Sequence, residues 1–341
     1  MIKSLYKLGL ATLALLFIIG QAHAQDITLR IHHFMSSKGN LHSKFLVPLA
    51  ERLETTSKGR IKVELFSSMA LGGRPSDLYD QAVDGAVDII LTLPGYTAGR
   101  FPKAEVFELP FMIQDPIVAS KAYWDLIETD LQNGEFDEVQ ILTGWVHGPG
   151  VIHSKEPIER LEDLKGKEIR GPTRLVTDLL NELGASPVGM PLPKIPENIS
   201  KGVISGAAVP WEVVPSIKLA ELVDNHTEMS AGNILYTAVF VLAMNQEAYD
   251  DMPDDLRAIL DAETGKNLAA IASTVVTDAD DVSRKAIAAT NNVVILDDTE
   301  VARWIAASKP VYDRWITTAQ KAGFDGEAAI AQAKSLMQAN Q

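Results

Sequence analysis

The chain has 341 residues, 31 basic and 45 acidic, and its net charge of −14 argues against nucleic acid or an anionic lipid surface as a partner. It contains no cysteine, which excludes disulfides, thiolate nucleophiles and zinc–thiolate sites. The length suggests about two domains, and 46% hydrophobic residues are enough for a core that needs no covalent cross-links.

The N-terminal segment has the pattern of an export signal. Lys3 and Lys7 give a positive start, an apolar run covers 8–20, and a small-x-small cleavage site ends at Ala24. The run is shorter than the roughly 20 apolar residues of a membrane span. We therefore predict a signal peptide over 1–24, cleavage after Ala24, and a mature protein in the periplasm.

The next segment alternates strand and helix patterns. In chain order, we expect strand 27–31, helix 41–55, strand 61–66, helix 75–85 and strand 87–93. This β-α-β-α-β order is typical of an open α/β sheet, in which ligands bind beyond the carboxyl ends of the strands.

A second α/β pattern follows in the middle of the chain. Strand patterns cover 140–146, 167–170 and 187–190, and a helix is expected over 174–183. The repetition of the pattern predicts a second lobe.

One long helix is expected over 253–290. Apolar residues recur there at helical spacing, and Gly265 is the only glycine. Such a helix would be about 57 Å long, whereas a lobe of about 130 residues is roughly 36 Å across. We therefore predict a helix that spans both lobes, with a break near Gly265 as the alternative. The tail over 299–339 is also predicted to be helical.

Common catalytic motifs are missing. The chain has no nucleophile elbow, phosphate-binding loop, HExxH pair or dinucleotide fingerprint. His147 and His153 lack an acidic neighbour at a useful metal-ligand spacing. We predict no catalytic residue, no metal and no cofactor, and a protein that is not an enzyme.

Several segments, taken in order, resemble the solute-binding proteins of tripartite ATP-independent periplasmic (TRAP) transporters. They are GRIKV at 59–63 with LG at 71–72, FELPF at 107–111, EDLKGKEIR at 162–170, GASPV at 184–188 and MN at 244–245. The resemblance covers nearly the whole mature chain.

This resemblance implies an α/β, two-lobed periplasmic binding protein fold with a long helix spanning both lobes. It divides the chain into lobe I (25–146 and 232–270) and lobe II (147–231 and 271–341). It also implies closure over an organic acid whose carboxylate pairs with an arginine, which matches Arg170. A planar guanidinium suits this role because it stays charged and binds a carboxylate through two hydrogen bonds.

The family often carries a second ligand-facing arginine about 20 residues earlier, where this chain reads Gly148-Pro149-Gly150-Val151. Arg174 could supply a second charge, or it could face solvent. The departure favours a monocarboxylate over a C4-dicarboxylate.

Further ligand contacts are expected at strand-end loops and at the crossings between lobes. Aromatic side chains there would suit an aromatic or apolar ligand body, and Glu212 could accept a hydrogen bond from the ligand or pair with Arg170. The candidates are Phe34, Tyr96, Trp145, His147, Trp211, Glu212, Asn233 and Tyr236.

We therefore predict a monomeric periplasmic receptor that captures a small organic carboxylate, an aromatic or apolar monocarboxylate, and delivers it to TRAP membrane subunits. The alternatives are a C4-dicarboxylate ligand in the same system, a secreted two-lobed enzyme acting on an organic acid, and a sensor module.

Overall fold

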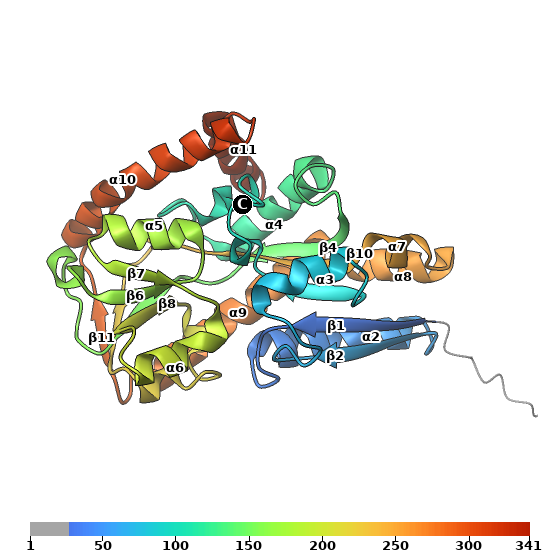
Figure 1. Cartoon of the computed structure of the whole chain (residues 1–341), viewed down its shortest axis with the longest axis horizontal. Helices are drawn as coiled ribbons and strands as arrows, with labels where there is room; N and C mark the ends of the chain where they lie inside the picture. The colour runs from blue at the N-terminus through green and yellow to red at the C-terminus, as the bar shows by residue number, and fades with distance from the viewer. Residues whose placement is uncertain (1–26) are drawn as a thin grey trace, which may run out of the picture.

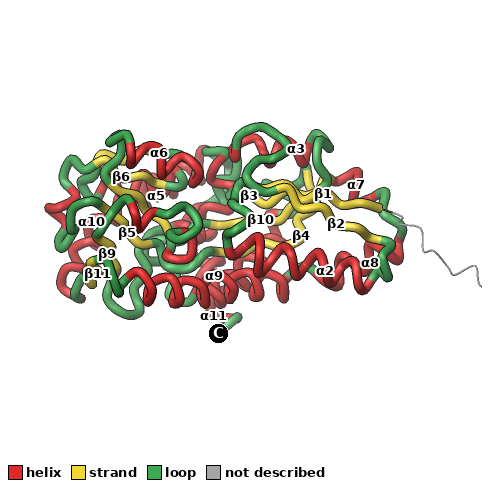
Figure 2. Tube along the Cα trace, turned by 90° about the horizontal axis from the view of Figure 1, so that it is seen from below, coloured by secondary structure: helices red, strands yellow, loops and turns green. Residues whose placement is uncertain are grey.

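The computed structural model describes residues 27–341 and contains two β-sheets that lie side by side along the long axis of the molecule (Figure 1, Figure 2). The predicted signal peptide lies outside the described residues. The two-lobed α/β architecture predicted from the sequence is confirmed.

The first sheet forms the centre of lobe I and has the order β2-β1-β3-β10-β4. Strand β1 pairs in parallel with β2 and β3, and β10 runs antiparallel to β3 and β4. Every residue of β3 and β10 is buried, as expected for strands covered on both faces. The bounds are β1 (Ile27–His33), β2 (Ile61–Phe66), β3 (Ile89–Thr92), β4 (Val139–Val146) and β10 (Val239–Asn245).

The second sheet forms the centre of lobe II and has the order β11-β9-β5-β8-β6-β7. Strand β6 pairs in parallel with β7 and β8, so the carboxyl ends of β6 and β8 meet at one edge of the sheet. The bounds are β5 (Val151–Ser154), β6 (Glu168–Gly171), β7 (Ser186–Gly189), β8 (Gly206–Val209), β9 (Asn225–Glu228) and β11 (Asn292–Ile295).

Helices cover both sheets (Figure 1). None of the helices in residues 27–341 has the length and apolar character to cross a membrane. Their bounds are α2 (Val47–Thr56), α3 (Leu78–Val83), α4 (Pro116–Leu126), α5 (Arg174–Glu182), α6 (Ile195–Ser200), α7 (Gln246–Asp250), α8 (Asp254–Glu263), α9 (Lys266–Ile287), α10 (Asp298–Lys321) and α11 (Gly326–Ala339).

The prediction of a single helix over 253–290 is wrong in one respect, because the helix breaks at Gly265 and forms α8 and α9. Gly265 has φ 76° and ψ −150°, a conformation that is essentially restricted to glycine. Strand β4 holds this conformation: the Gly265 N–H donates to the Leu142 carbonyl at 2.7 Å, and the Thr143 hydroxyl donates to the Gly265 carbonyl at 3.0 Å.

The 22-residue helix α9 still spans both lobes, at a length of about 33 Å. It packs on β4 and α4 of lobe I and on the short turn Trp211–Val213 of lobe II. Figure 2 shows it along one side of the molecule, where the two sheets adjoin.

The C-terminal helices do not belong to lobe II alone, which corrects the assignment of all of 271–341 to that lobe. Helix α10 starts beside β11 and crosses to lobe I, where Trp315 Nε1 donates to the Pro102 carbonyl at 3.0 Å and Tyr312 donates to the Pro110 carbonyl at 2.7 Å. Helix α11 then packs on α4 (Figure 1). At 24 residues, about 36 Å, α10 is long enough for this crossing.

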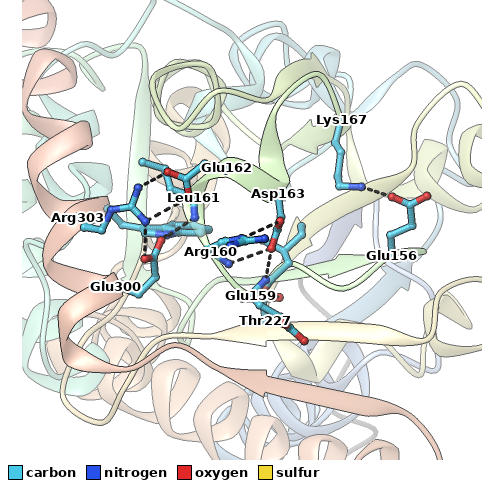
Figure 3. A network of polar contacts seen from close by, with 12 residues as sticks. Glu156, Glu159, Arg160, Leu161, Glu162, Asp163, Lys167, Thr227, Glu300 and Arg303 are labelled. Carbon is cyan, nitrogen blue, oxygen red and sulfur yellow. Dashed lines mark hydrogen bonds and ion pairs between the residues drawn. The ribbon is translucent and has the colours of Figure 1, made fainter.

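The start of α10 is fixed to lobe II by a polar network (Figure 3). The Leu161 N–H donates to Glu300 Oε1 at 2.6 Å, and Arg303 pairs with both Glu162 and Glu300. The network therefore attaches this helix to the turn that precedes β6, the strand that carries Arg170.

Candidate functional site

A small cavity of about 40 Å³ lies between the two lobes, at the strand ends where α/β sheets bind ligands. Both lobes contribute to its wall, and most of the side chains are aromatic or aliphatic. The lining residues are Phe34, Met35, Leu93, Tyr96, His147, Arg170, Pro172, Leu192, Val209, Pro210, Glu212, Val213, Tyr236 and Phe240.

Arg170, the third residue of β6, is the only lysine or arginine among the described residues that line this cavity, and its exposed fraction is 2%. The Arg170 Nε donates to the Met190 carbonyl at 2.8 Å and Nη1 donates to the Ala208 carbonyl at 2.9 Å, so neighbouring backbone fixes the guanidinium plane. Within residues 27–341, no carboxylate forms an ion pair with it. Burial lowers the pKa of Arg170, but an arginine remains charged, and a buried charge without a counterion is costly. The site therefore has an unmet requirement for an anion.

Two tyrosines flank the guanidinium. The Tyr96 hydroxyl accepts the Leu192 N–H at 3.1 Å and lies close enough to Arg170 for the guanidinium charge to affect its pKa. The Tyr236 hydroxyl is buried and has no hydrogen-bond partner in the described part of the chain. Desolvation by burial raises the pKa of both phenols, against the opposing effect of the Arg170 charge, so both remain protonated. Arg170 and Tyr236 can therefore donate together to a carboxylate.

His147 adds a hydrogen-bond acceptor to the same wall. Burial lowers its pKa to about 4, and the nearby charge of Arg170 adds to this effect, so the imidazole is neutral. Its Nδ1 lies 2.5 Å from the Gly148 carbonyl, which can only accept, so Nδ1 carries the proton and Nε2 is an acceptor. The ring packs edge-on against Tyr236, with centroids 5.5 Å apart.

Within residues 27–341, Glu212 is the only acidic residue that lines the cavity, and its exposed fraction is 4%. Asn40, from lobe I, donates to Glu212 Oε2 at 3.0 Å, and the Glu212 N–H donates to Asp280 Oδ1 at 2.7 Å. Burial raises the pKa of Glu212 to about 7, although Asn40 and the charge of Lys44 favour the ionised form. The carboxyl group therefore changes charge near neutral pH.

The structure brings six of the predicted site residues together around the cavity: Phe34, Tyr96, His147, Arg170, Glu212 and Tyr236. Phe34 and Tyr96 form an edge-on aromatic pair, with centroids 5.2 Å apart. These residues come from both lobes, so closure is needed to assemble them.

Four predicted residues lie elsewhere, and Arg174 is one of them. Trp145 is fully buried behind the cavity wall, where its ring stacks on Phe240 with centroids 5.3 Å apart. Trp211 and Asn233 line a separate surface groove, and Trp211 Nε1 donates to Glu228 there at 2.6 Å.

Arg174 does not line the cavity. It forms an ion pair with the buried Glu105, a residue of the chain segment that connects β3 to β4. This pair joins the start of α5 in lobe II to lobe I. A second contact, 3.6 Å long, reaches Asp178 one turn further along α5. Arg174 thus links the lobes, and its charge is already compensated by Glu105.

The sequence missed most of the apolar wall. Aliphatic and aromatic residues of the core and of a cavity wall have the same sequence pattern, so no signal in the sequence could have distinguished them. The missed residues are Met35, Leu93, Pro172, Leu192, Val209, Pro210, Val213 and Phe240.

A two-lobed α/β fold with a buried arginine between the lobes, unpaired within residues 27–341, defines a solute-binding protein for anionic ligands. The family model for bacterial extracellular solute-binding proteins, family 7, matches residues 31–318, and the chain belongs to this family. The TRAP resemblance found in the sequence is thereby confirmed, and the protein is a TRAP solute-binding protein.

Solved structures of similar proteins contain aromatic acids. A TRAP solute-binding protein from Rhodoferax ferrireducens T118, with copurified benzoate, is 44% identical, covers 92% of this chain and 98% of its own, and has a TM-score of 0.90. A marine metagenome TRAP protein specific for aromatic acids, with 3-hydroxybenzoate, is 38% identical, with coverages of 93% and 100% and a TM-score of 0.90. A periplasmic protein from Bordetella bronchiseptica, with bound mandelate, is 26% identical, with coverages of 92% and 100% and a TM-score of 0.84.

Proposed function

We propose that this protein captures a small aromatic monocarboxylate in the periplasm and presents it to the membrane subunits of a TRAP transporter. The observation that carries the proposal is the buried Arg170 guanidinium, which has no counterion in the described residues. A ligand carboxylate would supply the missing charge and accept hydrogen bonds from Arg170 and Tyr236.

The composition of the wall supports a single carboxylate. Arg170 is the only cationic side chain of the cavity, and Glu212 would repel a second carboxylate near it. The remaining wall is mainly aromatic and aliphatic, which suits a flat ring. The ligands of the three similar structures, benzoate, 3-hydroxybenzoate and mandelate, all combine one carboxylate with one ring.

Lobe closure is the proposed mechanism. Contacts between lobes surround the cavity: Tyr96 with Leu192, Asn40 with Glu212, and Glu105 with Arg174. The ligand stabilises the closed form because only that form offers it groups from both lobes. In this proposal the protein is an exported monomer. Its closed form holds the ligand, and the protein does not convert the ligand chemically.

Isothermal titration calorimetry with benzoate, 3-hydroxybenzoate and succinate tests the function. We expect the aromatic acids to bind more tightly than succinate and to be recovered chemically unchanged. Arg170→Ala should lose about 2–5 kcal/mol of binding free energy, because it removes one partner of a buried charge pair. Arg160→Ala is the matched control, since Arg160 is a largely exposed arginine of the same lobe. Near-native benzoate affinity in Arg170→Ala would refute the proposal.

A further inference from the structure

The cavity contains a second polar end that a simple aromatic carboxylate would leave unused. Glu212 Oε2 is occupied by Asn40, but no hydrogen bond reaches Oε1 in the part of the chain that the structure describes. The side chain is nevertheless almost fully buried. A ligand that fills the cavity would shield Oε1 from water, and a shielded acceptor without a partner is costly, so a donor from the ligand would be favoured there.

The surroundings of Glu212 hold it in place, and the described residues supply no cation that pairs with it. Its backbone N–H is bound by Asp280 of α9, and its side chain is bound by Asn40 of lobe I, so two elements fix its position. Among residues 27–341 it forms no ion pair with Lys44 or with Arg170, although Arg170 lines the same cavity. The cavity thus has a cationic end at Arg170 and a separate acceptor at Glu212.

His147 provides a second hydrogen-bond acceptor in the wall of the same cavity. His147 Nε2 is an acceptor, because its Nδ1 hydrogen is donated to Gly148, and it receives no hydrogen bond from the described residues. Two acceptors therefore face a ligand whose carboxylate can only accept. Benzoate would satisfy Arg170 and leave both acceptors without a donor.

We propose that Glu212 is a specificity-determining residue that selects aromatic monocarboxylates carrying a hydrogen-bond donor on the ring. This inference rests on the proposed function, since it requires the carboxylate to bind at Arg170. A phenolic hydroxyl and an aromatic amine share the necessary chemistry. A methoxy group cannot donate, and a site built around a hydrogen bond discriminates strongly against a ligand that lacks the donor.

The wild-type protein provides the first test. Calorimetry is performed with benzoate and with the 3- and 4-isomers of hydroxybenzoate, aminobenzoate and methoxybenzoate. At least one donor-bearing isomer should bind about 10- to 100-fold more tightly than benzoate and than the methoxy compound of the same substitution pattern. The hydroxy and amino compounds distinguish the two sources of the donor.

Glu212→Gln provides the second test. Asn40 donates to the side chain at position 212, so the amide oxygen of the new glutamine should face Asn40 and its NH₂ group should face the cavity. The acceptor then becomes a donor, and the hydroxy-to-methoxy affinity ratio should fall by about 10-fold or more while benzoate still binds. Glu221→Gln is the matched control, because Glu221 is an exposed glutamate of the same lobe.

The outcomes separate the two proposals. If no aromatic acid binds the wild type, the proposed function fails, and this inference fails with it. If benzoate binds as tightly as every donor-bearing isomer, or if Glu212→Gln leaves the hydroxy-to-methoxy ratio unchanged, only the role of Glu212 is overturned. The wild-type ligand series decides the question even if Glu212→Gln does not fold.

Discussion

Gly150 provides the space that the ring of Tyr236 occupies, and Gly150→Ala should disrupt the anion site. A Cβ atom at position 150 would lie 2.1 Å from Tyr236 Cε1 and 2.4 Å from its Cδ1 and Cζ atoms. Carbon atoms in favourable contact are about 3.5–4.0 Å apart, so the ring would have to move by more than 1 Å. That movement would take the Tyr236 hydroxyl away from Arg170 and separate the ring from His147.

Two measurable effects follow from this displacement. Overpacking of this kind typically costs about 1–3 kcal/mol of unfolding free energy. Loss of a hydrogen bond to the charged carboxylate should weaken benzoate binding about 10- to 100-fold. Denaturant unfolding measures the first effect and calorimetry the second. Tyr236→Phe should reproduce much of the affinity loss with less effect on stability, because it keeps the ring and removes only the hydroxyl.

Gly189→Ala is the control for Gly150→Ala. Gly189 lies in β7 of the same lobe, and a Cβ atom there would meet only Thr177 Oγ1, at an ordinary 3.7 Å. Its affinity and stability should stay close to those of the wild type. If Gly150→Ala bound benzoate with wild-type affinity, the position assigned to the Tyr236 ring in the anion site would be wrong.

Two further substitutions test the interior of lobe I and the break between α8 and α9. Desolvation raises the pKa of the buried Glu108 to about 8, far above its ordinary value of 4.5. The folded state therefore favours the protonated carboxyl group. The contribution of Glu108 to the free energy of unfolding is complete below pH 4.5 and is lost as the pH rises towards 8. In Glu108→Gln, the melting temperature relative to that of the wild type should therefore increase between pH 5 and pH 8, and a difference independent of pH would contradict this reasoning. Gly265→Ala should cost about 1–3 kcal/mol in denaturant unfolding, because alanine is strained at φ 76° and ψ −150°, and an unchanged midpoint would show that the kink does not require glycine.

Local periodicity predicted the regular elements of lobe I well. The strand expected over 61–66 is β2 within the same bounds, and the strand expected over 87–93 contains all of β3. These segments are short apolar or alternating runs bounded by turns, so their pattern depends little on the rest of the fold. Periodicity alone does not decide whether the helix breaks at Gly265, because the hydrogen bonds that hold the Gly265 backbone on β4 join residues more than 120 positions apart in the sequence.

The candidate site was predictable only in part. A sequence motif led to Arg170, but neighbours in sequence can face different environments. Trp211 and Glu212 are adjacent in one short turn, yet the indole reaches Glu228 in the outer groove while the carboxyl lines the cavity. The sequence also gave no indication that Arg174 would find a buried partner in Glu105 of the other lobe.

The stretch without the second arginine lies next to the ring of Tyr236. The stretch that often carries that arginine in the family contains Gly150 here, and the Tyr236 ring lies against the Gly150 backbone. Any side chain at position 150 would collide with that ring, so a second cation cannot be added there while Tyr236 stays in place. A cationic side chain at position 150 would therefore require Tyr236 to change as well, because a Cβ atom there already overlaps the ring.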